Sequence, residues 1–315
     1  INFVKSGLKD LSVSRTSFNW GIKVPDQKHV IYVWLDALTN YLSAVNYPNT
    51  KDNLYKKFWP ASVHIIGKDI LRFHAIYWPA FLMAAKIEPP KRIFGHGWIL
   101  SGDEKMSKSK GNILNPVEII NKYGVDEMRY YLMKEVSLGS DGTISLDNLK
   151  NCINSDLANN FGNLCQRVFT FVEKNCNNVV PQYNKFEKVD KDLMELITKK
   201  IESLKQMMDL QEINSYIKTV LNITFETNKY INDMEPWSLK KKDRKRMETV
   251  IYVALNQIRC ISILLNPIIP ISTNKVLNFL NYPNDLRYLS TLKDHKFFKP
   301  KVNLKKIEIL FKKFD

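Results

Sequence analysis

The sequence is poor in cysteine and has no long uninterrupted apolar run. Its 315 residues include four cysteines, spaced 13, 11 and 84 positions apart, and no CxxC or CxH pair. This spacing supports neither a zinc knuckle nor a disulfide framework, so we expect reduced thiols and a cytoplasmic protein. The most apolar stretch near the end, Cys260 to Leu265, stops at Asn266 and Pro267, far short of the roughly 18 residues that span a bilayer. We therefore expect no membrane-spanning segment.

Acidic residues are in deficit throughout the chain. There are 47 Lys and Arg against 32 Asp and Glu, a net charge of +15, and both halves of the chain are basic. A field of this sign attracts polyanions, which makes nucleic acid the partner to test first. A low-GC genome enriches Lys, Asn and Ile together and explains the excess equally well. The chain begins with Ile1 and shows no basic segment followed by an apolar one, so no signal peptide is predicted.

Up to about residue 150 the pattern is that of an α/β domain. Short apolar strands, Val30–Trp34 and Val63–Ile66, each run into a segment of helical period, as βα units do. After residue 114 the pattern becomes helical, with Asn115 as a predicted N-cap and Gly124 as a predicted stop. A second short helix is predicted over Asp126–Glu135.

The second half is predicted to be entirely helical. Apolar residues recur every three or four positions at Leu149, Ile153, Leu157, Phe161, Leu164 and Val168. Further helices are predicted over 190–209, 211–232 and 243–265, with prolines between them or at their ends. We expect the Lys-rich tail after Pro283 to pack back on the rest of the chain or to stay mobile. The sequence thus predicts an α/β fold followed by an all-α domain.

The strongest local motif is a lysine loop between two glycines, Gly102-Asp-Glu-Lys105-Met106-Ser107-Lys108-Ser109-Lys110-Gly111. Such a loop can place ammonium groups against a triphosphate, where negative charge develops on the leaving pyrophosphate. A solvated charged loop is the ordinary alternative. The string Lys-Met-Ser-Lys-Ser resembles the signature of class I aminoacyl-tRNA synthetases. The resemblance implies that Lys105 and Lys108 are catalytic and that they and Ser107 contact ATP, which brings its own magnesium.

Two aromatic stripes indicate which amino acid is activated. Trp34, Ala37 and Tyr41 are spaced i, i+3, i+7, and Ile70, His74 and Trp78 are spaced i, i+4, i+8, so each triple is predicted on one helical face just after a strand. On periodicity alone, core packing is the more typical explanation. A wall of Trp, Tyr and His without fixed charge suits a polarizable thioether, because sulfur packs well at ring edges. This chemistry points to methionine.

The segments that carry these stripes resemble methionyl-tRNA synthetases. Residues 32–38 read Tyr-Val-Trp-Leu-Asp-Ala-Leu, and residues 67–74 begin Gly-Lys-Asp-Ile and end Phe-His. The resemblance implies a methionine pocket lined by Trp34, Ala37, Tyr41, Ile70, His74 and Trp78. It also implies ATP contacts from Gly67 and Asp69 at the ribose and from His96 and Ile99 at the adenine. A carboxylate that accepts from ribose hydroxyls is sound chemistry for Asp69.

In the helical domain the same resemblance implies an anticodon reader. Asn163 and Arg167 are four positions apart and share a helical face, and Trp237 follows Pro236 near a later helix end. By residue type alone, Asn and Arg are expected to face solvent and Trp to lie in a core. In the family, the matching residues read the CAU anticodon, with the tryptophan stacked on an unpaired base. The basic run over 240–246 is expected to hold tRNA phosphates or to be a solvated face.

Two family motifs are absent from the sequence: a His-Ile-Gly-His type motif at the start of the Rossmann fold, and the zinc-knuckle cysteines of many members. We therefore expect the later portion of a longer enzyme, in three parts. Residues 1–114 would be the second half of the Rossmann-type catalytic domain with the lysine loop, 115–147 a connecting region that contacts the tRNA stem, and 148–315 an α-helical bundle that binds the anticodon. No zinc or other metal site is expected in the chain, and we expect a monomer.

The activity implied by the resemblance is that of a methionine–tRNA ligase, which activates methionine with ATP and transfers it to tRNA(Met). Three alternatives stay open. A leucyl, valyl or cysteinyl synthetase shares the lysine loop, but an apolar or zinc-bound pocket would replace the stripe of His74 and Trp78. A fragment with half a nucleotide fold would act only as a tRNA-binding module. A generic basic helical scaffold is the third alternative.

Overall fold

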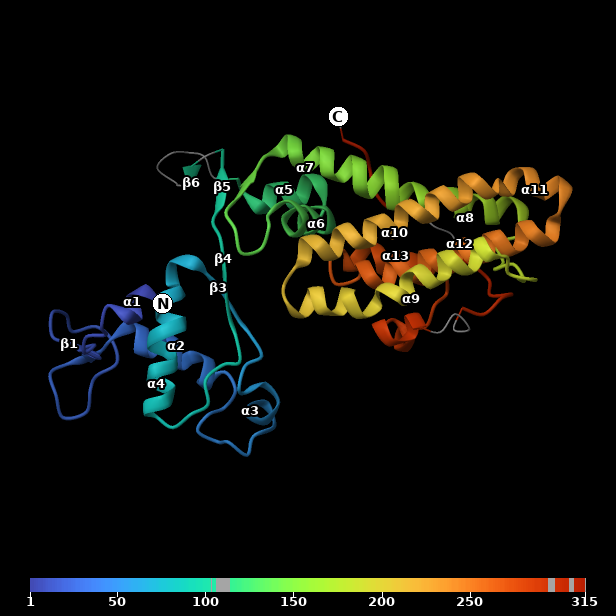
Figure 1. Ribbon diagram of the computed structural model, residues 1–315. Helices are drawn as coiled ribbons and strands as arrows, with labels where there is room; N and C mark the ends of the chain where they lie inside the picture. The colour runs from blue at the N-terminus through green and yellow to red at the C-terminus, as the bar shows by residue number, and fades with distance from the viewer. Residues whose placement is uncertain (103, 106–113, 294–297, 306–308, 315) are drawn as a thin grey trace. The chain divides into compact units, whose positions relative to one another are not determined.

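The computed structural model describes residues 1–102, 104–105, 114–293, 298–305 and 309–314. Contacts divide the chain into two compact units, unit 1 (Ile1–Gly97) and unit 2 (Trp98–Asp315). Figure 1 shows the short helices and strands of unit 1 in blue and cyan, and the helices of unit 2 in green to red.

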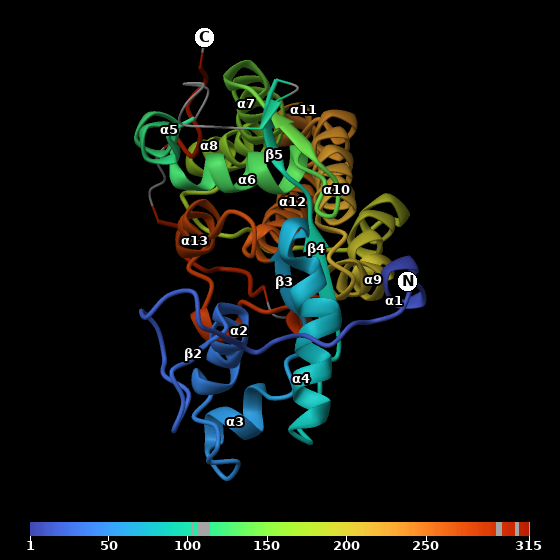
Figure 2. The same cartoon turned by 90° about the vertical axis from the view of Figure 1, so that its left-hand side faces the viewer.

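Unit 1 contains a parallel β-crossover. β3 (His64–Gly67) and β4 (Ile93–His96) pair in parallel and lie side by side in Figure 1 and Figure 2. Between them the chain forms a 3₁₀ turn, η1 (Lys68–Ile70), a π-helical turn, η2 (Phe73–Tyr77), and α4 (Trp78–Ala84). Parallel neighbours require such a crossover, which is the repeating unit of Rossmann-type folds. The strand predicted over 63–66 is confirmed to within one residue.

The remaining elements of unit 1 are short. They are α1 (Asn2–Lys5), the antiparallel pair β1 (Ser14–Arg15) and β2 (Val30–Ile31), α2 (Val33–Ser43) and α3 (Asn53–Phe58). The strand predicted over 30–34 was too long, because α2 begins at Val33 and includes Trp34. A small core joins α2, α4 and the segment between α3 and β3, with Leu38, Leu42, Trp59, Trp78 and Leu82 buried in it.

Unit 2 begins with a three-stranded sheet. β5 (Ile99–Ser101) pairs with β6 (Glu104–Lys105) in antiparallel fashion and with β7 (Gly142–Ile144) in parallel. α5 (Pro116–Tyr123) and α6 (Val125–Glu135) precede β7. The Asn115 side chain accepts a hydrogen bond from the Val117 amide at 3.0 Å, and Gly124 ends α5 with φ of 114°. Both predicted helix signals are therefore confirmed.

A long helical run follows, as the apolar spacing predicted, but its middle is not α-helical. α7 (Leu146–Cys152) and α8 (Asn163–Asn175) are joined by a π-helical segment, η4 (Ile153–Gly162). Apolar residues spaced four apart would drift by about 40° per step around an α-helix of 3.6 residues per turn. The looser π winding reduces that drift. A Cβ at Gly162 would lie 2.8 Å from the carbonyl oxygen of Leu157, so only glycine fits where this segment ends.

Three helices of 22 residues each form the body of the bundle. They are α9 (Lys188–Asp209), α10 (Ile213–Met234) and α12 (Arg244–Leu265). All three were predicted, to within two residues at each end. α11 (Pro236–Lys242), α13 (Pro270–Phe279) and two 3₁₀ turns, η5 (Asn284–Leu286) and η6 (Leu289–Lys293), complete the described elements.

α12 is the core helix of unit 2, and every residue from 249 to 265 is buried. Within the described chain it is the single helix long and apolar enough to cross a membrane. The expectation of no membrane-spanning segment considered only the run over 260–265 and not the rest of this helix. Because 94% of the apolar window is buried inside the structure, packing accounts for the composition.

The tail packs back on the bundle in its described parts, which confirms the first of the two expected arrangements. Phe298, Leu304 and Phe311 are buried. Asn154 and Phe314 exchange two hydrogen bonds, from the Asn154 amide to the Phe314 carbonyl at 2.6 Å and from the Phe314 amide to the Asn154 oxygen at 3.0 Å. These contacts attach the last described residues to η4.

Candidate active site and nucleic-acid interface

Unit 1 brings Trp34, Tyr41, His74 and Trp78 together in a cluster that we call the aromatic wall. The Tyr41 hydroxyl lies 3.0 Å from Nε2 of His74, and Nδ1 of His74 lies 3.0 Å from the Ile70 carbonyl oxygen. Because a carbonyl oxygen only accepts, Nδ1 carries the proton, and in the neutral ring Nε2 accepts from Tyr41. Trp34 stands edge-on to His74 at 6.2 Å between ring centroids, and Trp78 lies 6.3 Å from Tyr41.

The two predicted stripes differ in how far the backbone matches the expected helices. The first stripe lies on α2, as predicted, but Ala37 is exposed and no described contact joins it to the aromatic wall. The second stripe does not lie on a regular α-helix, although His74 and Trp78 both face Tyr41. Ile70 ends a 3₁₀ turn, His74 lies in the π-helical turn and Trp78 begins α4. Single π turns of this kind occur frequently at functional sites.

Two further rings belong to this cluster and were not predicted. Phe73 stacks on Trp34 with ring centroids 3.9 Å apart. His64 packs against Tyr41 at 4.3 Å and stands edge-on to His74 at 6.3 Å. Burial and the neighbouring His74 lower the pKa of His64 to about 4. The only sequence signal for His64 was its position in an apolar strand, two residues before Ile66 and on the same buried face.

The surface formed by these rings is suited to an uncharged ligand. Burial raises the pKa of the Tyr41 hydroxyl, which therefore stays protonated near neutral pH. His64 is neutral under the same conditions because its pKa is lowered. A pocket of about 460 Å³ opens beside the wall and is lined in part by Tyr41, Trp59 and His64. Aromatic edges make favourable contacts with the sulfur of a thioether.

Gly67, Asp69 and His96 meet at the carboxyl end of the β3–β4 pair. Gly67 and His96 are the last residues of their strands and lie opposite each other. A Cβ at Gly67 would lie 2.6 Å from a carboxylate oxygen of Asp69 and 3.9 Å from the His96 ring, so the glycine permits this close approach. Ligands of open α/β sheets bind at this edge. The exposed carboxylate of Asp69 can accept from a ligand that carries hydroxyl groups.

The other predicted ATP contacts belong to unit 2. Ile99 is the first residue of β5 and is exposed. Lys105 lies in β6, of which only the backbone is described. Ser107 and Lys108, the remaining predicted residues of the lysine loop, lie outside the described residues.

Unit 2 places Arg167 and Trp237 together. The Arg167 guanidinium lies over the Trp237 ring, 5.9 Å from its centroid, and donates a hydrogen bond of 2.7 Å to the Asn232 side-chain oxygen. Trp237 is 47% exposed, against the core position typical of tryptophan. An apolar pocket of about 370 Å³ adjoins it, lined in part by Phe171 and Ile251. The cluster therefore offers an aromatic face beside a fixed cation, which suits stacking of an unpaired base.

Asn163 is exposed one helical turn before Arg167 on α8, so the predicted common face is present. It does not line the Trp237 pocket but a neighbouring hollow of about 310 Å³, where the tail residue Phe311 lies against α8. Asn232 and Phe171 complete the cluster and were not predicted. Asn232 lies five residues before Trp237, a spacing that carries no helical-face signal.

The basic run over 240–246 does not form one face. Lys240, Lys241 and Lys242 are exposed in the last turn of α11. Arg246 points inward instead: its side chain is 9% exposed and binds Asp190 with both terminal nitrogens. Arg244 pairs with Glu248 at 3.1 Å. Neither role expected for this run, phosphate binding or a solvated face, applies to Arg246, because its charge is paired with Asp190 inside the protein.

The cysteines are free thiols, with Cys152, Cys165 and Cys260 buried. Within the described ranges of the chain, no group of three or more His, Cys, Asp or Glu side chains is placed to hold a metal ion.

Known proteins match this chain along its length. Residues 1–169 match the family model described as tRNA synthetases class I (M), and residues 180–315 match that of the anticodon binding domain of methionyl tRNA ligase. The methionine–tRNA ligase of Brucella suis biovar 1 is 48% identical over 288 residues, which are 91% of this chain and 56% of the relative. That of Rickettsia conorii is 47% identical over 319 residues, 100% of this chain and 63% of the relative.

Solved structures match nearly the whole chain as well. Mycobacterium tuberculosis methionyl-tRNA synthetase in complex with methionyl-adenylate has a TM-score of 0.94 at 41% identity, over 98% of this chain and 62% of that one. Its apo form has a TM-score of 0.92 at 38% identity. The chain thus spans between about half and two thirds of the length of the relatives that it matches.

Proposed function

Because this chain belongs to the class I aminoacyl-tRNA synthetases, in the methionyl-tRNA synthetase family, we propose that the protein acts as a methionine–tRNA ligase. In the proposed reaction, the methionine carboxylate attacks the α-phosphorus of ATP, which forms methionyl-adenylate and releases pyrophosphate. A hydroxyl of the terminal ribose of tRNA(Met) then attacks the methionyl carbonyl, which forms the ester and releases AMP. We further propose that the protein works in the cytoplasm as a monomer.

One observation carries the proposal: the amino acid and nucleotide clusters of unit 1 are adjacent in the chain. Asp69 lies at the strand edge that suits a ribose, and the next residue, Ile70, holds His74 of the aromatic wall through its carbonyl. A methionine against the wall and an ATP at the edge would therefore lie near each other. Holding two reactants in this way replaces most of the entropy cost of their encounter.

Different residues of unit 1 would bind the methionine, the ribose and the adenine. The aromatic wall and Ile70 would hold the methionine side chain, with the Tyr41 hydroxyl fixed by His74, and Ala37 would border that pocket. Gly67 and Asp69 would bind the ribose, and His96 and Ile99 the adenine. No protein nucleophile is needed for this chemistry.

The lysine loop would supply the electrostatic part of catalysis. Lys105, Ser107 and Lys108 would contact the phosphates, and the two lysines would offset the negative charge that develops on the leaving pyrophosphate. Magnesium would enter bound to ATP as part of the substrate. Asn163, Arg167 and Trp237 would read the anticodon. In domain terms, residues 1–114 would carry the catalytic chemistry, 115–147 the stem contact and 148–315 the anticodon.

Methionine-dependent exchange between ATP and pyrophosphate tests the proposal directly. We expect exchange with methionine well above that with leucine, valine or cysteine. Lys108→Ala should lower the exchange kcat by about 100-fold with little change in the KM for methionine, because the lysine acts on charge that develops in the transition state. An equal loss of rate and methionine affinity would contradict the role of Lys108. Exchange driven equally by another amino acid would contradict the substrate.

A second candidate function is favoured by the position of the RNA cluster. Arg167, Asn232 and Trp237 all lie within unit 2, so RNA binding by them requires nothing from unit 1. This chain would then act as a tRNA-binding module. If the chain binds an RNA hairpin with CAU in its loop and forms no adenylate from methionine and ATP, the second function describes it better than the first.

A further inference from the structure

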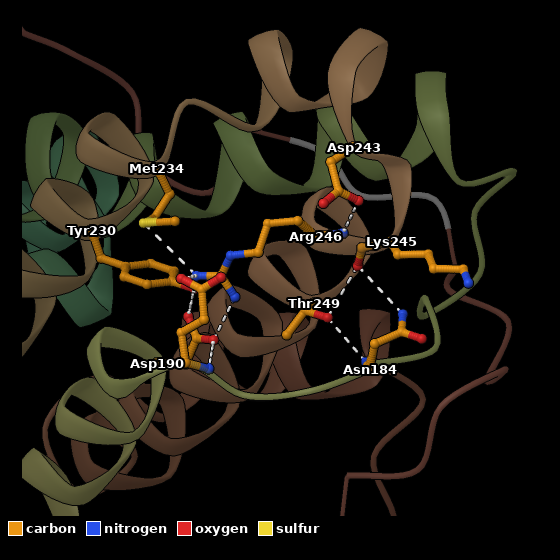
Figure 3. A network of polar contacts seen from close by, with 9 residues as sticks. Asn184, Asp190, Tyr230, Met234, Asp243, Lys245, Arg246 and Thr249 are labelled. Atoms are coloured by element: carbon orange, nitrogen blue, oxygen red, sulfur yellow. Dashed lines mark hydrogen bonds and ion pairs between the residues drawn. The ribbon is translucent and has the colours of Figure 1, made fainter.

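Figure 3 shows a network of polar contacts in which Asp190, Tyr230 and Arg246 point toward one another. The connection between Tyr230 and Arg246 carries Trp237. We propose that Asp190, Tyr230 and Arg246, which we call the clamp, are positioning residues that hold Trp237 in place for RNA. This inference rests on the proposed role of Trp237 in anticodon binding.

Asp190 is the centre of the clamp. Its carboxylate is fully buried and accepts two hydrogen bonds from Arg246, at 2.5 Å from Nη1 and 2.8 Å from Nη2. It also accepts from the Tyr230 hydroxyl at 2.6 Å and from the Glu187 amide at 2.8 Å. Four donors therefore satisfy both oxygens, and the guanidinium fork fixes the angle between its helix and the carboxylate.

The three residues of the clamp come from three helices. Asp190 lies in the first turn of α9, Tyr230 in the last turns of α10 and Arg246 in the first turn of α12. Arg246 also lies 3.9 Å from the sulfur of Met234, the last residue of α10. The clamp thus joins the point where the chain leaves α10 to the point where it enters α12.

Trp237 lies between these two points. It follows Met234 by three residues, and the turn between them places Glu235 in the left-handed region, with φ of 41°. Such a conformation persists in a residue other than glycine only when the surrounding structure holds it. Because the clamp fixes both flanks of this short connection, it restricts the direction in which the Trp237 ring points.

The clamp cannot act on RNA directly. Asp190 is inaccessible, and the side chain of Arg246 is 9% exposed with its charge paired. Helix capping alone does not explain the cluster either, since the α9 cap needs the bond from the Glu187 amide but not a guanidinium from α12. A buried ion pair is expensive to desolvate and adds little net stability, and its best-attested use is to specify one arrangement of helices.

The clamp would affect RNA binding by changing the fraction of molecules in which the Trp237 ring is oriented for stacking. If the clamp is weakened, the Trp237 ring spends less time in the orientation that stacks on a base. The apparent dissociation constant is inversely proportional to the fraction of molecules in that orientation, so a fall of this fraction to one tenth weakens binding about tenfold.

The test uses this chain, a short RNA hairpin with CAU in its loop and a second hairpin with a scrambled loop. Arg246→Lys keeps the charge but loses the fork, and Tyr230→Phe removes one donor to Asp190. Tyr216→Phe is the matched control: it lies on the same helix about 21 Å away, is equally buried, and loses a hydroxyl bonded to the Leu264 carbonyl at 2.6 Å.

We expect Arg246→Lys to weaken binding of the CAU hairpin about tenfold and Tyr230→Phe somewhat less, with little change for the scrambled hairpin. Tyr216→Phe should bind as the parent chain does. In a chain labelled with 5-fluorotryptophan, the ¹⁹F resonance that is absent from Trp237→Phe should shift or broaden in Arg246→Lys but not in Tyr216→Phe. An unchanged resonance and unchanged affinity in both clamp variants would overturn the proposal.

A double-mutant cycle separates this inference from the proposed function. In a Trp237→Ala background, Arg246→Lys should cause no further loss of affinity, because the clamp acts through the tryptophan. The same tenfold loss in both backgrounds would show that Arg246 acts by another route. If Trp237→Ala itself leaves binding of the CAU hairpin unchanged, the proposed role of Trp237 fails first, and the cycle identifies that failure as distinct.

Discussion

Substitution of Asp190 by alanine should be among the most destabilising single changes in unit 2. The change removes the acceptor of four hydrogen bonds and leaves the Arg246 guanidinium almost without solvent and without its closest partner. Breaking a buried ion pair from one side costs about 3–5 kcal/mol, because the remaining charge stays desolvated. The lost cap of α9 is worth about 1 kcal/mol and overlaps with this figure. We therefore expect a loss of about 3–5 kcal/mol in the free energy of unfolding.

Urea unfolding followed by far-ultraviolet circular dichroism measures this loss, since most of the helix lies in unit 2. A second variant distinguishes the charge from the packing. Replacing both partners by apolar residues, Asp190→Leu with Arg246→Met, should cost much less than the sum of the single changes, because no buried charge is then left unpaired. A loss below about 1 kcal/mol for Asp190→Ala, or additive losses in the double variant, would refute the reasoning.

Two further predictions concern unit 1. The pKa of His64 is about 4 in the folded chain against 6.5 for the free side chain, so the unfolded chain takes up the proton at a higher pH. The contribution of His64 to the stability of unit 1 should therefore be fully present above about pH 6.5 and fall as the pH drops towards 4. His64→Phe should remove this pH dependence. An identical acid profile in the variant would contradict this. Tyr41→Phe leaves Nε2 of the buried His74 without its partner, which should lower the free energy of unfolding by about 1–3 kcal/mol. Because the proposed methionine pocket then loses the bond that orients its wall, the KM for methionine should rise about tenfold, or about 1.4 kcal/mol of binding free energy, at nearly constant kcat. An unchanged KM in the exchange assay would exclude this role.

The parts of the fold that follow local rules were predictable from the sequence. Asn115 and Gly124 act within one turn of the helix that they bound, and the apolar period of α9, α10 and α12 extends over 22 residues each. Such patterns depend on neighbours three or four positions away, so no tertiary information is needed. β3 was predictable for a similar reason, because a short apolar run before Gly67 is typical of a strand in an α/β pattern.

The irregular helices could not be predicted in the same way. Ile70, His74 and Trp78 are spaced four apart, which an α-helix and a π-helical turn both accommodate, and the choice depends on what packs around His74. The wall partner Tyr41 lies 33 positions away, beyond any periodic signal. The predicted methionine residues therefore came from a family resemblance. His64 is not among the residues that this resemblance implies, and the sequence did not predict it although it packs closely on Tyr41.

Arg246 shows that counting basic residues in the sequence does not tell which of them are exposed. In the sequence it is one of six basic residues between positions 240 and 246, a pattern that indicates a solvated or RNA-binding face. Its partner Asp190 lies 56 positions earlier, on another helix, so the pairing has no local signature. In natural sequences the local pattern and the tertiary structure usually agree, and the exceptions tend to lie at functional sites. Under the proposed binding of RNA, burying one charge of a basic run beside an exposed tryptophan would separate two tasks. The exposed lysines would remain available to attract RNA, and the internal arginine would set the geometry with which the tryptophan meets it.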